Sequence, residues 1–186
     1  MSAPSANRVR IIGGAWRSRL ILFPAERGLR PTPDRVRETL FNWLGQDLSG
    51  KRCLDLFAGS GALGFEALSR GAAEVVSVEH SRSAAAALRE NAARLDARGW
   101  RLVVGDALHF LRDPGAGRFD VVFVDPPYDS GLVAAALARM PAVLAPGAAV
   151  YVESNGPIEP GAPWHVRKQA RAGSVHYRLL EIGEEA

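Results

Sequence analysis

The sequence predicts an α/β fold built on a doubly wound, mostly parallel seven-stranded sheet. Two observations carry this prediction. The run Val121–Val124 is apolar without polar alternation, which suits a strand covered on both faces. Strand-like and helix-like segments also alternate through most of the chain, as they do in β-α-β units. A length of 186 residues and an apolar share of 47% fit one packed domain with a small appendage.

The N-terminal part is predicted to form an extension of this domain. Residues 1–7 lack the apolar core of a secretory signal and are expected to be a short disordered lead. Residues 8–48 are expected to form a β-hairpin and a helix, and residues 49–186 the main domain. The hairpin should span Arg8–Pro24 and reverse tightly at Gly13–Gly14, to within a residue or two, because glycine permits a positive φ.

The helix of the extension should begin with Thr32 as its N-cap residue and Pro33 at its first helical position. Its apolar face is formed by residues at helical spacing, namely Val36, Leu40, Trp43 and Leu44. Gly45 and residues 47–50 should end the helix and mark the boundary to the main domain.

Positive charge is concentrated at the N-terminal end. Residues 1–52 contain ten basic and four acidic side chains, a net charge of +6, whereas residues 53–160 contain nine and thirteen, a net charge of −4. Such an asymmetry predicts a surface that faces a polyanion, although ordinary solvated arginines are the alternative. The candidate nucleic-acid contacts are Arg10, Arg17, Arg19, Arg30, Arg35 and Arg37.

A glycine-rich turn follows the first strand of the main domain. The strand begins at Cys53 and contains Asp55, and the turn places Gly59, Gly61 and Gly64 before a helix of residues 62–70. Glycines at a helix N-terminus let the backbone approach a ligand closely. This G-x-G-x-x-G spacing fits both a dinucleotide and S-adenosylmethionine, so spacing alone does not choose between them.

Acidic residues end the next two predicted strands. Glu79 ends the strand of residues 74–79 and is placed to accept hydrogen bonds from ribose hydroxyls. Asp106 follows the strand of residues 101–105, where it could accept from an adenine amino group. A helix over residues 81–98 should separate these strands.

The buried strand of residues 119–124 ends in the tetrapeptide Asp125-Pro126-Pro127-Tyr128. The two prolines cannot continue the strand and make the turn rigid. The Asp125 carboxylate and the Pro126 carbonyl are acceptors that can grip the hydrogens of an exocyclic amino group, and Tyr128 can stack on the base. The alternative is a plain exit from a strand.

The rest of the chain completes the sheet and excludes some chemistry. A helix over residues 130–140, a strand over 148–153 and a closing antiparallel pair over 164–166 and 174–182 are predicted. The single cysteine, Cys53, is expected to be a core residue in a cytoplasmic protein. No metal is expected because the histidines show no ligand spacing, and no apolar run is long enough to span a membrane.

The order of motifs resembles the bacterial 16S ribosomal RNA guanine-N2 methyltransferase family of the RsmD type, which are Rossmann-like S-adenosylmethionine-dependent enzymes. The motifs are Arg-Ile-Ile-Gly-Gly, the run from Arg30 to Glu38, the glycine turn after Asp55, and Asp125-Pro-Pro-Tyr. The resemblance covers nearly the whole chain. It implies a Rossmann-like fold, a cytoplasmic rRNA-binding enzyme of ribosome biogenesis, and guanine 966 of the small-subunit RNA as target.

The resemblance also implies roles for single residues. Asp55, Gly59 and Gly61 would shape the pocket for the methionine end of S-adenosylmethionine, and Glu79 would hold its ribose. Asp106 and the Ala107 backbone would hold the adenine. Asp125 and the Pro126 carbonyl would orient the target amine, and Tyr128 would stack on the guanine.

Three other functions fit parts of the sequence. A DNA adenine-N6 methyltransferase uses the same tetrapeptide, but usually carries a target-recognition domain for which 186 residues leave little room. A non-catalytic RNA-binding protein would not need Asp125 or the glycine turn. An NAD-dependent oxidoreductase would need a hydride-transfer acid, and none is evident. Whether the substrate is naked 16S rRNA or an assembling small subunit is left open.

Overall fold

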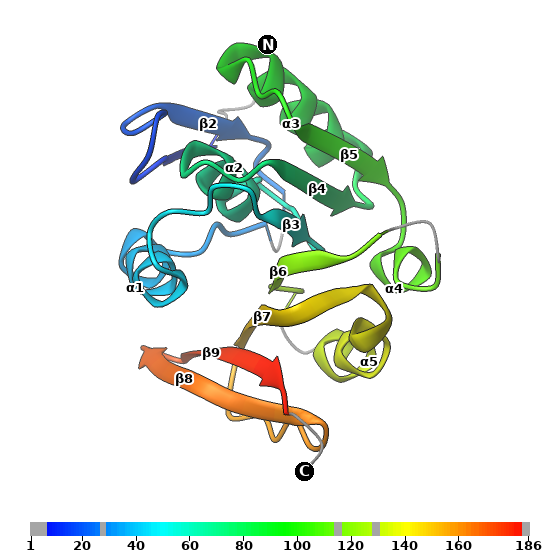
Figure 1. Ribbon diagram of the computed structural model, residues 1–186. Helices are drawn as coiled ribbons and strands as arrows, with labels where there is room; N and C mark the ends of the chain where they lie inside the picture. Colours follow the sequence, from blue (N-terminus) through cyan, green and yellow to red (C-terminus); the bar gives the residue numbers. More distant parts are fainter. Residues whose placement is uncertain (1–6, 27–28, 114–116, 128–130, 184–186) are drawn as a thin grey trace.

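The computed structural model describes residues 7–26, 29–113, 117–127 and 131–183. It contains a seven-stranded sheet and a separate two-stranded hairpin (Figure 1). The strands of the large sheet are β3 (Arg52–Asp55), β4 (Glu74–Glu79), β5 (Trp100–Val104), β6 (Phe119–Val124), β7 (Leu144–Ser154), β8 (Trp164–Ala172) and β9 (Val175–Ile182). The hairpin consists of β1 (Asn7–Arg10) and β2 (Leu20–Phe23). The helices are α1 (Asp34–Leu44), α2 (Ala62–Ser69), α3 (Arg82–Leu95), α4 (Ala107–Phe110), α5 (Leu132–Arg139) and the 3-10 helix η2 (Met140–Val143).

The sheet has the order β5-β4-β3-β6-β7-β9-β8, which confirms the predicted seven-stranded, mostly parallel arrangement. β3 to β7 are parallel neighbours, and β9 runs antiparallel to both β7 and β8. The strand order reverses between β3 and β6, which lie side by side. In open α/β sheets, ligands bind in the crevice beyond the carboxyl ends of the strands at such a reversal.

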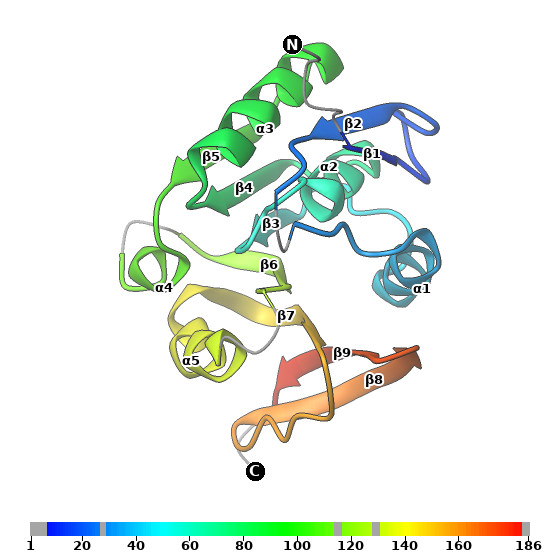
Figure 2. The same cartoon turned by 180° about the vertical axis from the view of Figure 1, so that it is seen from behind.

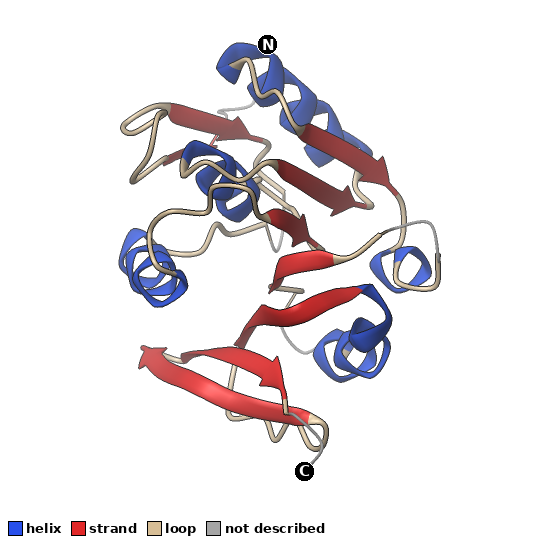
Figure 3. Cartoon of the chain, in the orientation of Figure 1, coloured by secondary structure: helices blue, strands red, loops and turns tan. Residues whose placement is uncertain are grey.

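Each face of the sheet has its own hydrophobic core. One core joins the sheet to α1, α2, α3 and the hairpin, and the other joins it to α4 and α5 (Figures 2 and 3). Neighbouring residues of β6 alternate between the two, since Phe123 lies in the first core and Val122 and Val124 in the second. Two covered faces explain why this strand has no polar alternation.

The hairpin exists, but the predicted tight reversal at Gly13–Gly14 is wrong. β1 pairs with β2 from Asn7 opposite Phe23 to Arg10 opposite Leu20, and residues 11–19 form a wide loop. The exposed edge of β2 is capped by Asn91 of α3, which accepts from the Leu22 N–H and donates to the Leu22 carbonyl. β1 begins at Asn7, one residue before the predicted hairpin, and residues 1–6 lie outside the described residues.

The two glycines serve to dock the loop on α2 instead. Ser69 at the end of α2 donates its hydroxyl to the Gly13 carbonyl and accepts from the Ala15 and Trp16 N–H groups through its own oxygens. Gly14 has φ +75°, and a Cβ there would lie 1.8 Å from the Ser69 carbonyl oxygen. Only glycine fits so close an approach, so the tertiary contact rather than a turn explains the residue.

Helix α1 begins one residue later than predicted, with Pro33 at the N-cap position and no side-chain cap. The Thr32 hydroxyl is directed to the end of the sheet, as described below. Val36 and Leu40 are fully buried as predicted, while Trp43 is only half-buried and stacks on Tyr177 of β9 with ring centroids 5.3 Å apart. Gly45, with φ +96°, ends the helix at the predicted residue.

A buried carboxylate, Glu66 of α2, joins the extension to the main domain. Its oxygens accept from the Ile12 and Gly13 N–H groups, each at 2.8 Å. They also accept from Arg37 at 3.2 Å and Arg70 at 2.9 Å, and the Glu66 and Arg37 side chains are both 0% exposed. One carboxylate thus connects the loop, α1 and α2, and balances the buried guanidinium charges.

Smaller differences from the predicted boundaries have local causes. α3 ends at Leu95 rather than Arg98, because Asp96 adopts a left-handed conformation with φ +49°. The short helix α4 was not predicted, and β8 extends to Ala172 because it pairs along the whole of β9.

Replacing Glu66 by glutamine should strongly destabilise the protein. The neutral amide would leave the buried Arg70 guanidinium without its carboxylate partner, and Arg37 with Asp34 alone, so we expect a loss of about 3–5 kcal/mol of unfolding free energy. Urea denaturation followed by circular dichroism measures the change. Glu74→Gln is the matched control, because Glu74 pairs with the half-exposed Arg52 and should cost less than about 1 kcal/mol. Equal effects of the two variants would contradict a structural role for Glu66.

Candidate active site

Three carboxyl groups lie in a row at the carboxyl ends of adjacent strands. Asp55 ends β3, Asp125 directly follows β6, and Glu153 lies near the end of β7. Asp55 is in register with Phe123, and Asp125 and Glu153 each follow the last paired residues of β6 and β7, Val124 and Val152. The alternation of the strands places all three side chains on the face that carries α1 and α2.

The glycine turn lies directly beside this row. Gly59 has φ +52°, and its N–H donates to the Glu79 carboxylate at 2.7 Å. Gly61 has φ +81° and forms the N-cap position of α2. A Cβ at Gly61 would lie 2.5 Å from Leu88 of α3, so packing against a helix explains this glycine at least as well as access for a ligand.

Asp55 is buried beneath the turn and is only 2% exposed. Its carboxylate accepts from the Gly64 N–H at 3.0 Å. Burial raises the pKa of Asp55 to about 7; the Gly64 hydrogen bond opposes this and the charge of Glu79 adds to it. A buried carboxyl group whose pKa is raised toward neutral pH is a feature of functional sites.

The other two acids predicted at strand ends differ in their surroundings. Glu79 is 6% exposed, and its carboxylate accepts from the N–H groups of Gly59 and Ser81, each at 2.7 Å. Asp106 is exposed and caps α4 by accepting from the His109 N–H at 2.7 Å, while Ala107 is buried. β4 and β5 are neighbours in the sheet, so both acids line the same edge as Asp55.

Asp125 is half-buried at the start of the rigid turn, and Pro126 after it is buried. The Thr32 hydroxyl lies 3.2 Å from Oδ2 of Asp125. Burial raises the pKa of Asp125 well above its usual range, and the charge of Glu153 raises it further. Tyr128, the predicted stacking residue, lies outside the described residues.

The N-terminal extension crosses the edge where these acids lie. Glu26 accepts from the Ser81 hydroxyl beyond β4, at 3.1 Å for the shorter contact. A Cβ on Gly59 would meet the Leu29 side chain at 2.9 Å, and Thr32 reaches Asp125. Glu26, Leu29 and Thr32 therefore lie beside the tips of β4, β3 and β6, respectively.

The predicted site omitted Thr32 and Glu153. Thr32 resembled a helix cap, and nothing local shows that its hydroxyl turns toward another strand. Glu153 had a usable signal, because it is an acid at the end of an apolar strand, as Glu79 is.

The predicted RNA-contacting arginines do not form one group. The prediction that Arg37 contacts RNA is corrected, because its side chain is 0% exposed and ion-paired with Asp34 and Glu66. Burial lowers the pKa of Arg37, and the charges of Glu66 and Asp34 oppose this change. Arg10 is exposed and lies 3.2 Å from Asp34, and Arg19 donates to the Arg94 carbonyl. Arg17, Arg30 and Arg35 are exposed, and Arg30 shares a surface hollow with Arg8.

Cys53 is 0% exposed, and burial raises the pKa of its thiol to about 12, so it is a core residue as predicted.

Among the described residues, no group of three His, Cys, Asp or Glu side chains could hold a metal ion. None of the described helices has the length and apolar character that a bilayer crossing requires.

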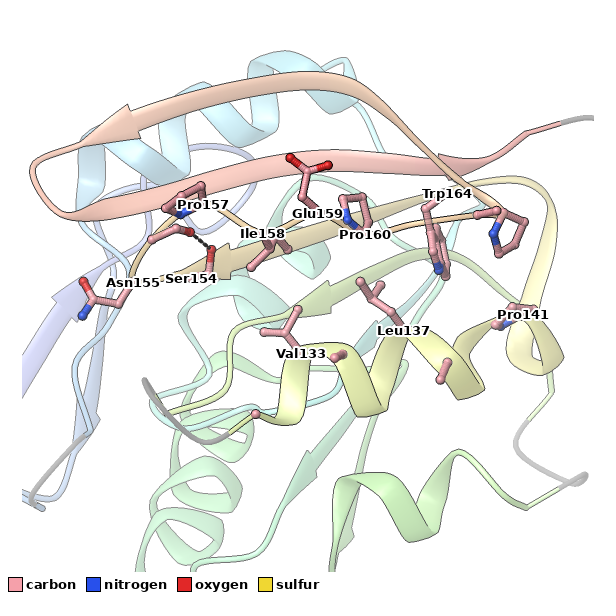
Figure 4. A pocket seen from close by; sticks show the side chains of 16 residues that line it. Val133, Leu137, Pro141, Ser154, Asn155, Pro157, Ile158, Glu159, Pro160 and Trp164 are labelled. Atoms are coloured by element: carbon pink, nitrogen blue, oxygen red, sulfur yellow. Dashed lines mark hydrogen bonds between the residues drawn. The ribbon is translucent and has the colours of Figure 1, made fainter.

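An apolar groove of about 520 Å³ lies on the other face of the sheet, between α5 and residues 155–163 (Figure 4). Val133 and Leu137 of α5 face Ile158 and Trp164 across it. None of the predicted site residues lines this groove, so the acids at the strand ends belong to a different place.

Solved structures identify the class of the fold. A protein of Escherichia coli described as a candidate methyltransferase, yhhF, has a TM-score of 0.85 and 43% sequence identity; the match covers 96% of this chain and 100% of that one. The sheet and its row of acids therefore belong to a Rossmann-like methyltransferase.

Sequence relatives narrow the class. The family model described as Conserved hypothetical protein 95 matches residues 9–181. The chain is 44% identical over 183 residues to Ribosomal RNA small subunit methyltransferase D of Escherichia coli (strain K12), covering 95% of this chain and 91% of that protein. It is 41% identical over 189 residues to the protein of that name from Haemophilus influenzae, covering 97% and 98%. The chain belongs to the ribosomal RNA small subunit methyltransferase D family.

Replacing Asp55 by asparagine should flatten the pH dependence of stability. Because the pKa of Asp55 is raised from 3.8 to about 7 on folding, its contribution is complete below about pH 4 and is lost as the pH rises to about 7. The shift corresponds to on the order of 4 kcal/mol. Urea denaturation of the cofactor-free protein between pH 4 and pH 8 measures it. Parallel curves for wild type and variant would show that Asp55 titrates normally.

Proposed function

We propose that the protein transfers a methyl group from S-adenosylmethionine to the exocyclic N2 amine of a guanine in 16S ribosomal RNA. The observation that carries this proposal is the pairing of β3 with β6, which brings the glycine turn and Asp125 to neighbouring positions at the same edge of the sheet. Membership of the family supplies the substrate class, since its relatives are named for the small-subunit RNA. Guanine 966 is the target that the motif resemblance implies.

The residues at the crevice fit a cationic, hydroxyl-rich cofactor. Asp55 and Glu79 are buried carboxyl groups beside the N-terminus of α2, and both are hydrogen-bond acceptors. Asp55 with the turn at Gly59 and Gly61 would hold the methionine end, and Glu79 would hold the ribose. Asp106 and the Ala107 backbone would hold the adenine. A bound sulfonium would offset part of the repulsion among the carboxyl groups.

Asp125 and the Pro126 carbonyl would position the target amine for in-line attack. The amine is a poor nucleophile because its lone pair is delocalised into the ring. Hydrogen bonds to Asp125 and to Pro126 favour a pyramidal nitrogen whose lone pair faces the methyl carbon. When bound, S-adenosylmethionine would supply an electrophilic methyl group with the thioether as its leaving group, and Asp125 would take up the amine proton. In well-oriented systems such positioning lowers the activation free energy by up to about 7–11 kcal/mol.

The N-terminal extension supplies cations for the RNA backbone. Arg17, Arg30 and Arg35 are exposed and remain proposed phosphate contacts, as do the exposed Arg10 and Arg19. The extension also lies beside the crevice, so RNA held there would place a flipped guanine near Asp125.

Replacing Asp125 by alanine should abolish turnover and leave cofactor binding nearly intact. The variant loses an acceptor for the amine, so we expect kcat to fall by about 10²–10⁴-fold. Transfer of a labelled methyl group to small subunits purified from cells without the enzyme measures kcat, and calorimetry measures the Kd of S-adenosylmethionine. A kcat of Asp125→Ala within about threefold of the wild-type value would contradict the proposed role of Asp125.

A short RNA that contains the target guanine should lose methylation when that guanine is replaced by inosine. Inosine differs by the absence of the N2 amine, so it has no group to accept the methyl. The guanine RNA, an otherwise identical duplex DNA and the inosine RNA are compared by mass spectrometry of the nucleosides. Methylation of the DNA at adenine would instead identify an adenine-N6 enzyme.

A further inference from the structure

The Thr32 hydroxyl lies between two carboxyl groups from neighbouring strands. Its oxygen is 3.2 Å from Oδ2 of Asp125 and 3.2 Å from Oε2 of Glu153. The Tyr151 hydroxyl donates to the same Oε2 of Glu153 at 3.0 Å. Thr32, Tyr151 and Glu153 are all buried, whereas Asp125 is half-buried.

The Thr32 hydroxyl is a single proton donor beside two carboxyl oxygens. The Thr32 hydroxyl has one proton, so it can donate fully to only one of the two oxygens. The Tyr151 proton is already directed to Glu153. The Thr32 oxygen can form a hydrogen bond with the second carboxyl oxygen only if that carboxyl group carries a proton and donates it. Without that proton, the lone pairs of the Thr32 oxygen and of the second carboxyl oxygen face each other.

The charged surroundings favour a single shared proton. Asp55 on β3 adds a third acid to the row, and the charge of Asp55 and of Glu153 acts to raise the pKa of Asp125. Tyr151 lies on β7, opposite Leu179 of β9, and burial raises its pKa well above the usual range, so its hydroxyl keeps its proton. The Arg37 guanidinium lies behind Thr32, but it is paired with Asp34 and Glu66.

We propose that Glu153 and Thr32 are positioning residues for Asp125, which hold one proton between the two carboxyl groups through the Thr32 hydroxyl. With Oδ2 held by Thr32, the other oxygen of Asp125 is left to accept from the target amine. The pair then carries one negative charge rather than two, and it takes up the amine proton as the C–N bond forms. This inference rests on the proposed function for its catalytic part, and on the hydrogen bonds alone for its proton-sharing part.

The role of Thr32 is tested by two nearly isosteric substitutions. Thr32→Val keeps the shape and removes the hydroxyl, so kcat should fall by tenfold or more while the Kd of S-adenosylmethionine stays within about twofold. Thr32→Ser keeps the hydroxyl and should restore kcat to within about threefold of wild type. A Thr32→Val enzyme with wild-type kcat would overturn the proposal, and so would failure of serine to restore activity in a protein that folds normally.

The role of Glu153 is tested by the pH dependence of Glu153→Gln. Removing the Glu153 charge removes one cause of the raised Asp125 pKa, so the acid limb of the kcat profile should move to lower pH. A residue that only supports the fold would not move this limb. Glu159→Gln, on the exposed loop after β7, is the control and should leave the profile unchanged.

A measurement without RNA separates this inference from the proposed function. Because the Asp125 pKa is raised on folding, its contribution to stability is lost as the pH rises. Glu153→Gln should therefore lose less unfolding free energy than wild type between pH 5 and pH 8. Equal pH slopes would overturn the shared proton. A reduced slope in a protein that methylates no RNA would instead reject the proposed function and keep the proton-sharing pair.

Discussion

The buried Glu66 carboxylate is the interaction on which the geometry of the site depends. Glu66 fixes Arg37 of α1, and the Nε of Arg37 donates to the Thr32 carbonyl at 3.1 Å. The Thr32 hydroxyl in turn reaches Asp125 and Glu153. A chain of polar contacts thus runs from the middle of α2 to the acids at the strand ends. Buried ion pairs add little net stability, but they define a unique arrangement when every partner is satisfied.

This chain of contacts changes the meaning of the N-terminal extension. Its net positive charge indicates a polyanion-binding surface, and its exposed arginines remain consistent with that. Arg37, however, is buried inside the protein, where it donates to the Thr32 carbonyl and so fixes the residue that contacts Asp125 and Glu153. The same short stretch from Arg30 to Glu38 thereby contains both a surface arginine and a structural one. Charge counted along a sequence cannot separate the two, because burial depends on a carboxylate 29 residues away.

The features that follow from local pattern were predictable, and those that depend on distant partners were not. Apolar runs located all seven strands of the sheet, and acids at their ends located Asp55, Glu79 and Asp125, because parallel strands share one carboxyl edge. The prediction of a tight turn at Gly13–Gly14 was wrong because these glycines instead allow the loop to pack closely against Ser69 of α2. Thr32 was taken for a helix cap because its true partners lie 93 and 121 residues away in the chain.

The position of β9 has a consequence for how the chain is made. β9 is inserted between β7 and β8, so β7 gains its second neighbour only from residues 175–182. Tyr177 of this strand also supplies the ring that Trp43 stacks on and that lies beside Tyr151. While the nascent chain is still shorter than this, the strand that carries Glu153 has an open edge. β7 can therefore complete its pairing only after residues 175–182 have been synthesised, near the end of the chain.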